Sequence, residues 1–247
     1  MNKKNMNNKI MNENIYGKKI LITGASTGIG KKIAVLYAKK GAQLILLSRN
    51  IKDLESLYDA IMENKGVFKP FIYPFDFLHA SWNKYEKLSK IIDKEFNLLD
   101  SIICNAGILG KLSPVEHVEI QDWYKVMQVN LNSNFMLIKS LIHLLKKSEK
   151  PIVICNTINN LGIPKAFWGA YSVSKSALNH LIQMLSIENK KIIFHLVDPG
   201  KINTQLTRKA YPIGSVNHLK KPQHIVDHYL YLLNNADKNY KNSVYNI

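Results

Sequence analysis

One short stretch near the start of the chain, an apolar segment that leads into a glycine-rich turn, constrains the fold more than any other feature. Residues 19–22 (Lys-Ile-Leu-Ile) are typical of a buried strand, and residues 23–30 (Thr-Gly-Ala-Ser-Thr-Gly-Ile-Gly) form the turn. Apolar residues then recur at helical spacing over residues 33–38. Glycines allow a tight turn and close approach to a ligand, and the helix N-terminus offers free N–H groups to a phosphate. The stretch therefore predicts a dinucleotide site, with an ordinary strand–helix turn as the alternative.

The same alternation of apolar and amphipathic segments continues along the chain. Predicted strands cover residues 19–22, 43–48, 71–75, 99–104, 151–155, 192–197 and a short 243–247, and predicted helices cover 33–38, 54–61, 85–96, 123–145 and 170–187. Strands that are apolar on both faces and separated by helices predict a parallel sheet of about seven strands with helices on both faces. The sequence thus predicts an α/β protein, one doubly wound Rossmann-type domain over residues 15–247 behind a flexible tail at 1–14.

Glycines and polar residues gather just beyond the predicted strands. They are Gly24, Arg49, Asp76, Asn105, Asn156 and Pro199. Ligands of open parallel sheets bind beyond the carboxyl ends of the strands. We therefore expect these residues to border one ligand site.

The formal net charge of +16 raises the alternative of a nucleic-acid-binding protein. Only Arg49 and Arg208 are arginines among the 34 basic residues. Recognition of bases and phosphates favours the bidentate arginine side chain, and the lysines are spread along the chain. Solvated surface charge, without a nucleic-acid partner, is the favoured interpretation.

Other classes of protein are disfavoured by the absence of their signals. No apolar run reaches the ~18 residues of a membrane span, and the first fourteen residues lack the apolar core of a signal peptide. We therefore expect a cytoplasmic protein with no membrane partner. Cys104 and Cys155 match no zinc or redox spacing, which predicts buried core residues and no metal site.

Four motifs in order resemble those of the short-chain dehydrogenase/reductase family. They are the glycine turn at 23–30, Asn-Ala-Gly at 105–107, Tyr-Ser-Val-Ser-Lys at 171–175, and Pro-Gly at 199–200 with Thr204. The resemblance covers roughly residues 17–235. Within the family, residues 126–130, 135–137 and 168–171 resemble a bacterial group of YciK-type oxidoreductases. The resemblance implies an oxidoreductase acting on a small carbonyl or alcohol substrate.

By this resemblance, Tyr171 is the general acid/base that exchanges a proton with the substrate oxygen. Lys175 follows one helical turn later, and its charge is expected to lower the tyrosine pKa from ~10 and to hold the nicotinamide ribose. Asn130 corresponds to the helix asparagine that supports this lysine through a water. An ordinary surface pair on an amphipathic helix is the alternative for Tyr171 and Lys175.

The resemblance also implies the residues that bind the cofactor. They are Gly24, Ser26, Thr27, Gly28, Ile29, Gly30, Ser48, Arg49, Asp76, Phe77, Asn105, Ala106, Gly107, Tyr171, Lys175, Pro199, Gly200 and Ile202. Asp76 would contact adenine, with a simple turn-forming aspartate as the alternative. Asn105 would tie strands together through backbone hydrogen bonds. Residues 201–221 would form a substrate loop.

The choice of cofactor follows from the end of the second predicted strand. Enzymes that prefer NAD(H) carry an acidic residue there, which bonds the ribose 2′-hydroxyl. This chain has Ser48 and Arg49 instead, and an arginine with no nearby carboxylate suits a 2′-phosphate. NADP(H) is therefore the expected cofactor, and NAD(H) the less favoured one.

The chain departs from the family pattern at one catalytic position. The family places a serine thirteen residues before the tyrosine, where this chain has Ile158. Thr157 and Asn159 are adjacent, but side-chain alternation along a strand points them away, and Asn156 lies further back. Losing one donor to a reacting carbonyl costs on the order of 10²–10³ in turnover. An NADP(H)-binding protein with weak or no catalysis is thus an alternative from another class.

Two further expectations concern substrate and assembly. Within the reductase class, a 3-oxoacyl-carrier-protein reductase is the alternative, because a basic surface could dock an acidic carrier. The family's glycine-rich C-terminal tail is absent, yet a homo-oligomer, dimer or tetramer, through the two long helices fits the family pattern.

Overall fold

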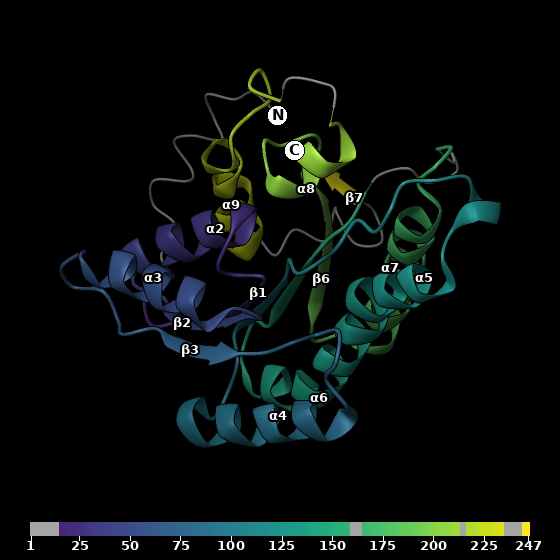
Figure 1. Ribbon diagram of the computed structural model, residues 1–247. Helices are drawn as coiled ribbons and strands as arrows, with labels where there is room; N and C mark the ends of the chain where they lie inside the picture. The colour runs from purple at the N-terminus through teal and green to yellow at the C-terminus, as the bar shows by residue number, and fades with distance from the viewer. Residues whose placement is uncertain (1–14, 159–164, 213–215, 235–243) are drawn as a thin grey trace.

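Seven parallel strands form the centre of the fold, in the order β3-β2-β1-β4-β5-β6-β7 (Figure 1). The computed structural model describes residues 15–158, 165–212, 216–234 and 244–247. The strands are β1 Lys19–Thr23, β2 Gln43–Ser48, β3 Phe71–Pro74, β4 Ser101–Cys104, β5 Ile152–Asn156, β6 Ile193–Asp198 and β7 Val244–Asn246. Every neighbouring pair is parallel. The predicted α/β class and seven-stranded parallel sheet are confirmed, with strand ends that differ by one or two residues. The predicted tail at 1–14 lies outside the described residues.

Helices cover both faces of the sheet (Figure 1). They are α2 Gly28–Lys39, α3 Ile51–Met62, α4 Trp82–Phe96, α5 Ile120–Met127, α6 Ser133–Lys147, α7 Gly169–Glu188, α8 Gln205–Ala210 and α9 Val226–Asn234, with short 3₁₀ turns at Val115–His117 and Pro222–His224. Side chains of α2, α3 and α9 pack on one face, and those of α4, α6 and α7 on the other. In β1, Ile20 and Ile22 face the first layer and Leu21 the second, as strand alternation requires.

A wide turn joins α5 to α6. The sequence predicts one long helix here, and the structure instead places a π-helical turn at Gln128–Asn132. The side chains of Ser133 and Asn134 donate to the carbonyl oxygens four residues back, at 2.6 and 2.8 Å. π turns are frequent at functional sites, and this one holds the fully buried Asn130.

The strand order reverses between β1 and β4, the point at which doubly wound sheets bind their ligands. From β1 the chain continues to β2 and β3 on one side of β1, and then crosses to β4 on the other side. The carboxyl ends of β1, β2, β4, β5 and β6 thus face one edge of the sheet.

The two cysteines are buried free thiols on neighbouring strands. Cys104 of β4 is the register partner of Cys155 of β5. The expectation that both are core residues is confirmed.

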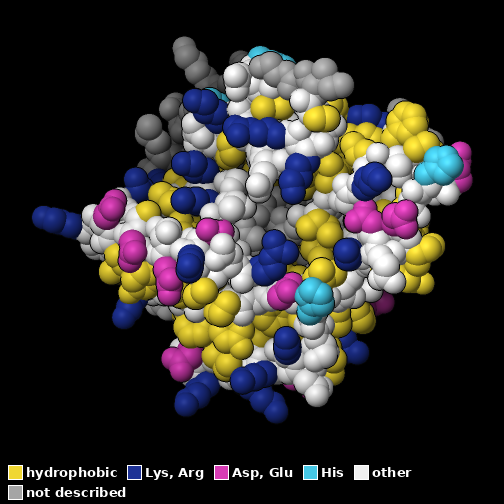
Figure 2. Space-filling model, viewed as in Figure 1, with side chains coloured by type: hydrophobic (Ala, Val, Ile, Leu, Met, Phe, Trp, Pro, Cys, Tyr) yellow, Lys and Arg dark blue, Asp and Glu magenta, His cyan; other side chains and the backbone are white. Residues whose placement is uncertain are grey.

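Basic side chains are dispersed over the surface that Figure 2 presents. Lys and Arg alternate there with acidic and apolar side chains, and do not form one continuous patch. This distribution favours solvated surface charge on that face over a nucleic-acid-binding surface. Within the described ranges of the chain, none of the helices combines the length and apolar character that crossing a bilayer requires.

Candidate active site

Two cavities lie next to each other along the carboxyl edge of the sheet. The larger, of about 520 Å³, runs from the glycine bend past the ends of β2 and β3. The smaller, of about 240 Å³, runs from the start of α2 to the start of α7. Both are lined by Thr27, Gly107, Gln205 and Leu206, so they form one groove with two ends.

The glycine bend lets the backbone come close to the end of β4. Gly24 has a φ of +60°, and a Cβ there would lie 3.0 Å from Ala106 Cα. A Cβ on Gly30 would lie 2.4 Å from the carbonyl oxygen of Gly24. Gly24 lines the larger cavity, whereas Gly30 lines neither. Gly30 allows the close approach of α2 to the bend, and its predicted contact with the cofactor stays a prediction.

Hydrogen bonds fasten this bend to the loop after β4. The backbone N–H groups of Asn105 and Ala106 donate to Thr23 Oγ1 at 3.0 and 2.9 Å. Asn105 Nδ2 donates to the carbonyl oxygens of Thr23 and Gly24, each at 3.1 Å. The predicted strand-tying role of Asn105 is thus present, and it fixes the floor of the groove.

The N-terminus of α2 opens onto the groove. Thr27 occupies the cap position without a side-chain hydrogen bond to the helix, and the first turn holds no acidic residue. Gly28 and Ile29 of this turn line the smaller cavity. Uncapped N–H groups and the positive end of the helix dipole suit a phosphate, so the geometry here fits a dinucleotide pyrophosphate.

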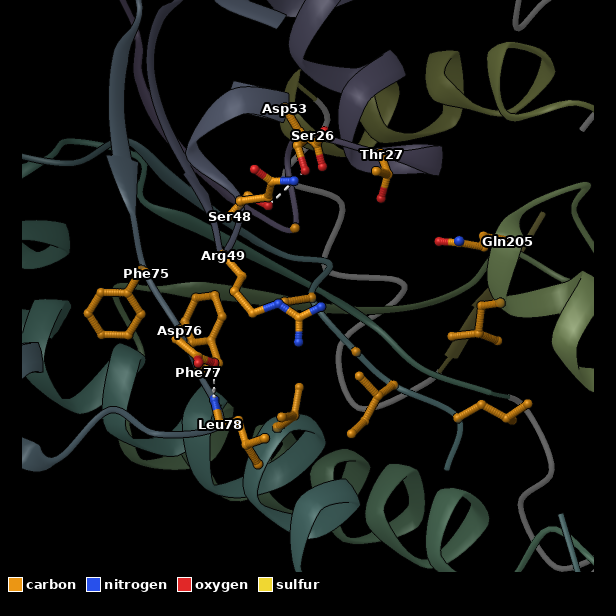
Figure 3. A pocket seen from close by; sticks show the side chains of 18 of the residues that line it. Ser26, Thr27, Ser48, Arg49, Asp53, Phe75, Asp76, Phe77, Leu78 and Gln205 are labelled. Atoms are coloured by element: carbon orange, nitrogen blue, oxygen red, sulfur yellow. Dashed lines mark hydrogen bonds between the residues drawn. The ribbon is translucent and has the colours of Figure 1, made fainter. Parts of the chain in front are cut away.

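Hydroxyl and guanidinium groups line the other end of the groove. Ser26 Oγ and Ser48 Oγ lie 2.7 Å apart. Figure 3 shows the side chain of Arg49 extending into the larger cavity, with Asp76 on one side of it and Asp53 closer to Ser26. The expectation that Arg49 has no carboxylate nearby is wrong. Asp53 lies in the first turn of α3, and Asp76 comes after β3. Both carboxylates line the same cavity as Arg49.

Asp76 makes the turn contact of the alternative interpretation and also lines the larger cavity, and its contact with adenine stays a prediction. Its Oδ1 accepts from the N–H of Leu78 at 3.0 Å, a turn contact, and its Oδ2 lies 2.8 Å from His79 Nδ1. Burial would raise the pKa of Asp76, but the hydrogen bonds from His79 and Leu78 and the nearby charges of His79 and Arg49 together lower it. The carboxylate is therefore held ionised at the cavity wall.

Tyr171 and Lys175 lie on the buried face of α7 and line the smaller cavity with Gly28 and Pro199. Lys175 Nζ donates to the backbone carbonyl of Asn156 at 2.8 Å and lies 5.9 Å from the centre of the Tyr171 ring. The surface-pair alternative is wrong, because the side chains of both residues are at most 8% exposed.

Burial dominates the ionisation of this pair. Burial, with the carboxylate of Asp198 as the second cause, raises the pKa of Tyr171 to about 12. Burial also lowers the pKa of Lys175 to about 8, partly offset by Cys155 and Cys104. The expected lowering of the tyrosine pKa is therefore not found in this structure, where burial and Asp198 both raise the pKa of Tyr171 and Lys175 is not among the causes.

Asn130 contacts the backbone beside the groove. Its Oδ1 accepts from the N–H of Ile108, and its Nδ2 donates to the Ile108 carbonyl, both at 2.9 Å. Nδ2 also lies 3.0 Å from Ser174 Oγ. These bonds position the loop after β4, and the predicted support of Lys175 through a water stays a prediction.

A side-chain network links the C-terminal helix to this site. Tyr229 of α9 donates its hydroxyl to Asn156 Oδ1 at 2.7 Å, and Asn156 Nδ2 donates to Asn105 Oδ1 at 2.9 Å. The backbone carbonyl of the same Asn156 holds Lys175. One residue at the end of β5 thus connects α9, the glycine bend and the lysine.

The residue at the position of the family serine, Ile158, is apolar and has apolar neighbours. Ile158 lines the smaller cavity and packs with the cluster around Tyr171. Thr157 turns its hydroxyl to Asn179 of α7, as strand alternation predicts. The amide of Asn156 bonds Asn105 and Tyr229. Asn159 lies outside the described residues.

Folding brings together nearly all the residues that the sequence singled out for the cofactor. Those lining one or both cavities are Gly24, Ser26, Thr27, Gly28, Ile29, Ser48, Arg49, Asp76, Phe77, Asn105, Ala106, Gly107, Tyr171, Lys175, Pro199, Gly200 and Ile202. Sequence reasoning missed Asp53, Asp198 and Gln205, which also line them. The strand-end rule could have found Asp198, which ends β6. In the part of the chain that the structure describes, no cluster of His, Cys, Asp and Glu could hold a metal ion.

Comparisons with known proteins agree with this geometry. The sequence model of the short chain dehydrogenase family matches residues 18–212. The uncharacterized oxidoreductase YciK of Escherichia coli strain K12 is 35% identical over 215 residues, which are 87% of this chain and 85% of that protein. The crystal structure of a short-chain dehydrogenase from Escherichia coli CFT073 complexed with NADPH superposes with a TM-score of 0.90 at 32% identity, covering 95% of this chain and 98% of the other. The structure of the E. coli oxidoreductase yciK superposes with a TM-score of 0.91 at 32% identity, covering 95% and 96%.

Proposed function

Since the chain belongs to the short-chain dehydrogenase family, we propose that it transfers hydride between NADP(H) and a carbonyl or alcohol substrate. The observation that supports this most is the shared cavity of Tyr171, Lys175 and the start of α2. A proton donor, Tyr171, and the phosphate-binding N-terminus of α2 thereby line the same cavity. The glycine turn does not by itself require a tyrosine in this cavity, and the tyrosine does not require a glycine turn.

The groove provides a complementary group for each part of the dinucleotide. The uncapped N-terminus of α2 would bind the pyrophosphate, and the bend at Gly24 lets it approach the backbone. Asp76 and Phe77 would border the adenine, and Pro199 and Gly200 the nicotinamide. When bound, the nicotinamide supplies or accepts the hydride.

Tyr171 would act on the substrate oxygen. In the reduction direction its phenol donates a proton to the oxygen as the carbon is reduced, and in oxidation the phenolate removes the proton. A pKa of about 12 keeps the phenol protonated at neutral pH, which suits reduction. The buried Lys175, held by the Asn156 carbonyl, would orient the ribose and favour the phenolate when it forms.

The cofactor proposal relies on Arg49. Its side chain extends into the larger cavity beside Ser26 and Ser48, where a 2′-phosphate could be bonded by the guanidinium and the hydroxyls (Figure 3). The carboxylate of Asp53 lines the same cavity and favours a ribose hydroxyl. We weigh Arg49 more heavily, since two solved relatives are complexes with NADP or NADPH.

A second candidate, an NADP(H)-binding protein with weak catalysis, is favoured by one observation. Ile158 occupies the place from which a serine would polarise the substrate carbonyl, and the nearby polar side chains of Thr157 and Asn156 have other partners. Tyr171 would then be the one side-chain donor to the substrate oxygen among these residues. The lack of a second donor predicts slow turnover of the carbonyl substrate and leaves the type of reaction unchanged.

One assay distinguishes the two candidates. Purified protein is mixed with NADPH and a panel of reactive aldehydes and ketones, and loss of absorbance of the reduced cofactor is followed. The oxidoreductase proposal expects carbonyl-dependent oxidation of NADPH above the rate without protein. Tight NADPH binding in calorimetry with no turnover of any carbonyl would favour the binding protein. Failure to bind NADPH or NADH would overturn both.

We also propose that copies of the chain associate through α5 and α7. These helices pack side by side (Figure 1) and carry exposed apolar side chains, with Ile120 63%, Tyr124 61% and Ile187 56% exposed. Exposed apolar side chains on neighbouring helices are typical of an interface. Mass measurement by light scattering tests this, and a monomer at micromolar concentration would contradict it.

A further inference from the structure

A basic and aromatic cluster lies directly beside Tyr171, outside the groove assigned to the cofactor. It consists of Lys165, Trp168, Lys201 and Tyr211, and we call it the basic rim. The Trp168 ring lies edge-on to the Tyr171 ring at 5.7 Å between centres, and 6.1 Å from the ring of Tyr211. The basic rim therefore adjoins the residue that would contact the reacting carbonyl.

Two ammonium groups converge on one hydroxyl in this rim. Lys165 Nζ donates to Tyr211 Oη at 2.9 Å and lies 4.2 Å from the centre of the Trp168 ring. Lys201 Nζ lies 4.9 Å from the centre of the Tyr211 ring. Burial would raise the pKa of Tyr211, but these two lysines together lower it. The potential at this hydroxyl is thus positive.

No carboxylate neutralises these lysines within the described parts of the chain. The two ion pairs found there, Asp76–His79 and Asp93–Lys147, involve neither Lys165 nor Lys201. Asp198 lines the smaller cavity with Tyr171 and Lys175, and its Oδ1 accepts from the N–H of Gly200 at 2.8 Å. The cavity at Tyr171 thus holds one charge of each sign, whereas the basic rim holds two lysines that belong to neither ion pair, so an anion would be attracted at the basic rim.

An apolar wall connects Tyr171 to the basic rim. Leu109 and Ala210 pack with Tyr171, and Leu112, Ile158 and Leu206 pack against them. Ile158 and Leu206 also line the smaller cavity, so the wall begins inside it. The body of a substrate whose carbonyl lies at Tyr171 would contact this wall and then reach the lysines.

We propose that the substrate is a carbonyl compound with an apolar body and an anionic group remote from the carbonyl, bound by Lys165 and Lys201. This rests on the proposed function, because the carbonyl is placed by Tyr171. The Trp168 ring contacts both ends, since its centre lies 5.7 Å from that of the Tyr171 ring and 4.2 Å from Lys165 Nζ. Apolar contact would position the body, and the lysines would select its charged end.

The test compares two probes that share the same aromatic body and differ in charge: 4-carboxybenzaldehyde and its neutral methyl ester, methyl 4-formylbenzoate. The ester group withdraws electrons more strongly than the carboxylate, so the aldehyde of the ester is intrinsically the more reactive, and a preference for the acid cannot come from reactivity. With NADPH, we expect kcat/KM of the acid to exceed that of the ester by about tenfold, as one charge-assisted hydrogen bond to a surface lysine allows. The double variant Lys165→Gln with Lys201→Gln should lose this preference, so that the ratio falls to one or below. Lys90→Gln, which removes an exposed lysine of α4, is the matched control and should retain the preference.

Binding of both probes to the protein without cofactor, measured by calorimetry, separates this inference from the proposed function. Equal turnover of acid and ester by the wild type would overturn the anionic substrate class and leave the oxidoreductase standing. Preferred binding of the acid, lost in the double variant, with no turnover of either probe would support the anion site and overturn the proposed reaction. Equal or absent binding of the two probes, with no preference in turnover, would overturn the inference. Because the wild-type comparison needs no variant, a misfolded double variant cannot obscure the result.

Discussion

Lys175 Nζ donates a hydrogen bond of 2.8 Å to the backbone carbonyl oxygen of Asn156, which anchors the buried amine of α7 to the end of β5. The side chain of the same Asn156 bonds Asn105, beside the glycine bend, and Tyr229 of α9. The amine and the cofactor cradle are thus positioned by one residue. Because a backbone carbonyl cannot rotate as a side chain can, the lysine has one preferred position in the cavity.

Tyr229→Phe tests this network. The variant leaves the buried Asn156 Oδ1 without its donor, which should lower the free energy of unfolding by roughly 1–3 kcal/mol. A shift of Asn156 would also move the Lys175 anchor, so turnover should fall more than NADPH affinity does. Chemical denaturation and steady-state kinetics measure the two effects. Tyr58→Phe, on the partly exposed surface of α3, is the control, and equal effects in both variants would contradict the network.

Arg49→Ala tests the choice of cofactor. Loss of a charge-assisted hydrogen bond to the 2′-phosphate should weaken NADPH binding by about 10- to 100-fold and leave NADH binding within about twofold. Asp53→Asn removes the opposing charge from the same cavity and should strengthen NADPH binding. Calorimetric titration with both cofactors measures this. An equal affinity change for NADPH and NADH in Arg49→Ala, or none, would rule out the assignment.

Ile158→Ser tests whether a missing donor limits the rate. A serine hydroxyl at this position would face the cavity beside Tyr171 and polarise the carbonyl, so kcat should rise about tenfold or more. Ile158→Val keeps the position apolar and should leave kcat nearly unchanged. If the serine variant folds, binds NADPH and gains no rate, the limiting group lies elsewhere.

The lowered pKa of Lys175 predicts a pH-dependent affinity for the cofactor. Burial holds this pKa at about 8, so above pH 8 the amine of the free protein loses its proton. The negative charge of NADPH would favour the ammonium and draw a proton back, so affinity should fall above about pH 8, by at most about tenfold per pH unit. Calorimetry in buffers of different ionisation enthalpy would detect the uptake of this proton on NADPH binding, and Lys175→Met should abolish the uptake. An NADPH affinity that stays constant between pH 7 and 10 would contradict the prediction.

The sequence predicts those parts of the site that depend on local pattern. The glycine turn, the strand ends and the helical spacing of Tyr171 and Lys175 are all short-range features, and a parallel sheet brings strand ends to one edge. The residues that line the two cavities follow from these rules. The fold class follows for the same reason, since strands apolar on both faces need helices on each side.

Contacts between distant segments could not be predicted in the same way. Tyr229 lies 73 positions from Asn156, and no motif marks it as a partner. Asp76 follows β3 and lies 27 positions from Arg49, so nothing in the local pattern places the two in the same cavity. The tyrosine pKa depends on burial, which the spacing of two residues on a helix does not reveal.

The turn at Gln128–Asn132 was missed for a related reason. A π turn and an α-helix share nearly the same apolar spacing over a few residues, so periodicity does not separate them. The π turn matters for the site, because it holds Asn130 against the backbone of Ile108.

The rate of carbonyl-dependent NADPH oxidation by Tyr171→Phe measures whether Tyr171 donates the proton to the substrate oxygen. The variant keeps the ring that packs on Trp168 and removes the hydroxyl alone. If the Tyr171 hydroxyl donates the proton, NADPH affinity should stay within about threefold of the wild type and kcat should fall about 10²-fold or more. A variant that binds NADPH and reduces the same carbonyls at the wild-type rate would contradict it.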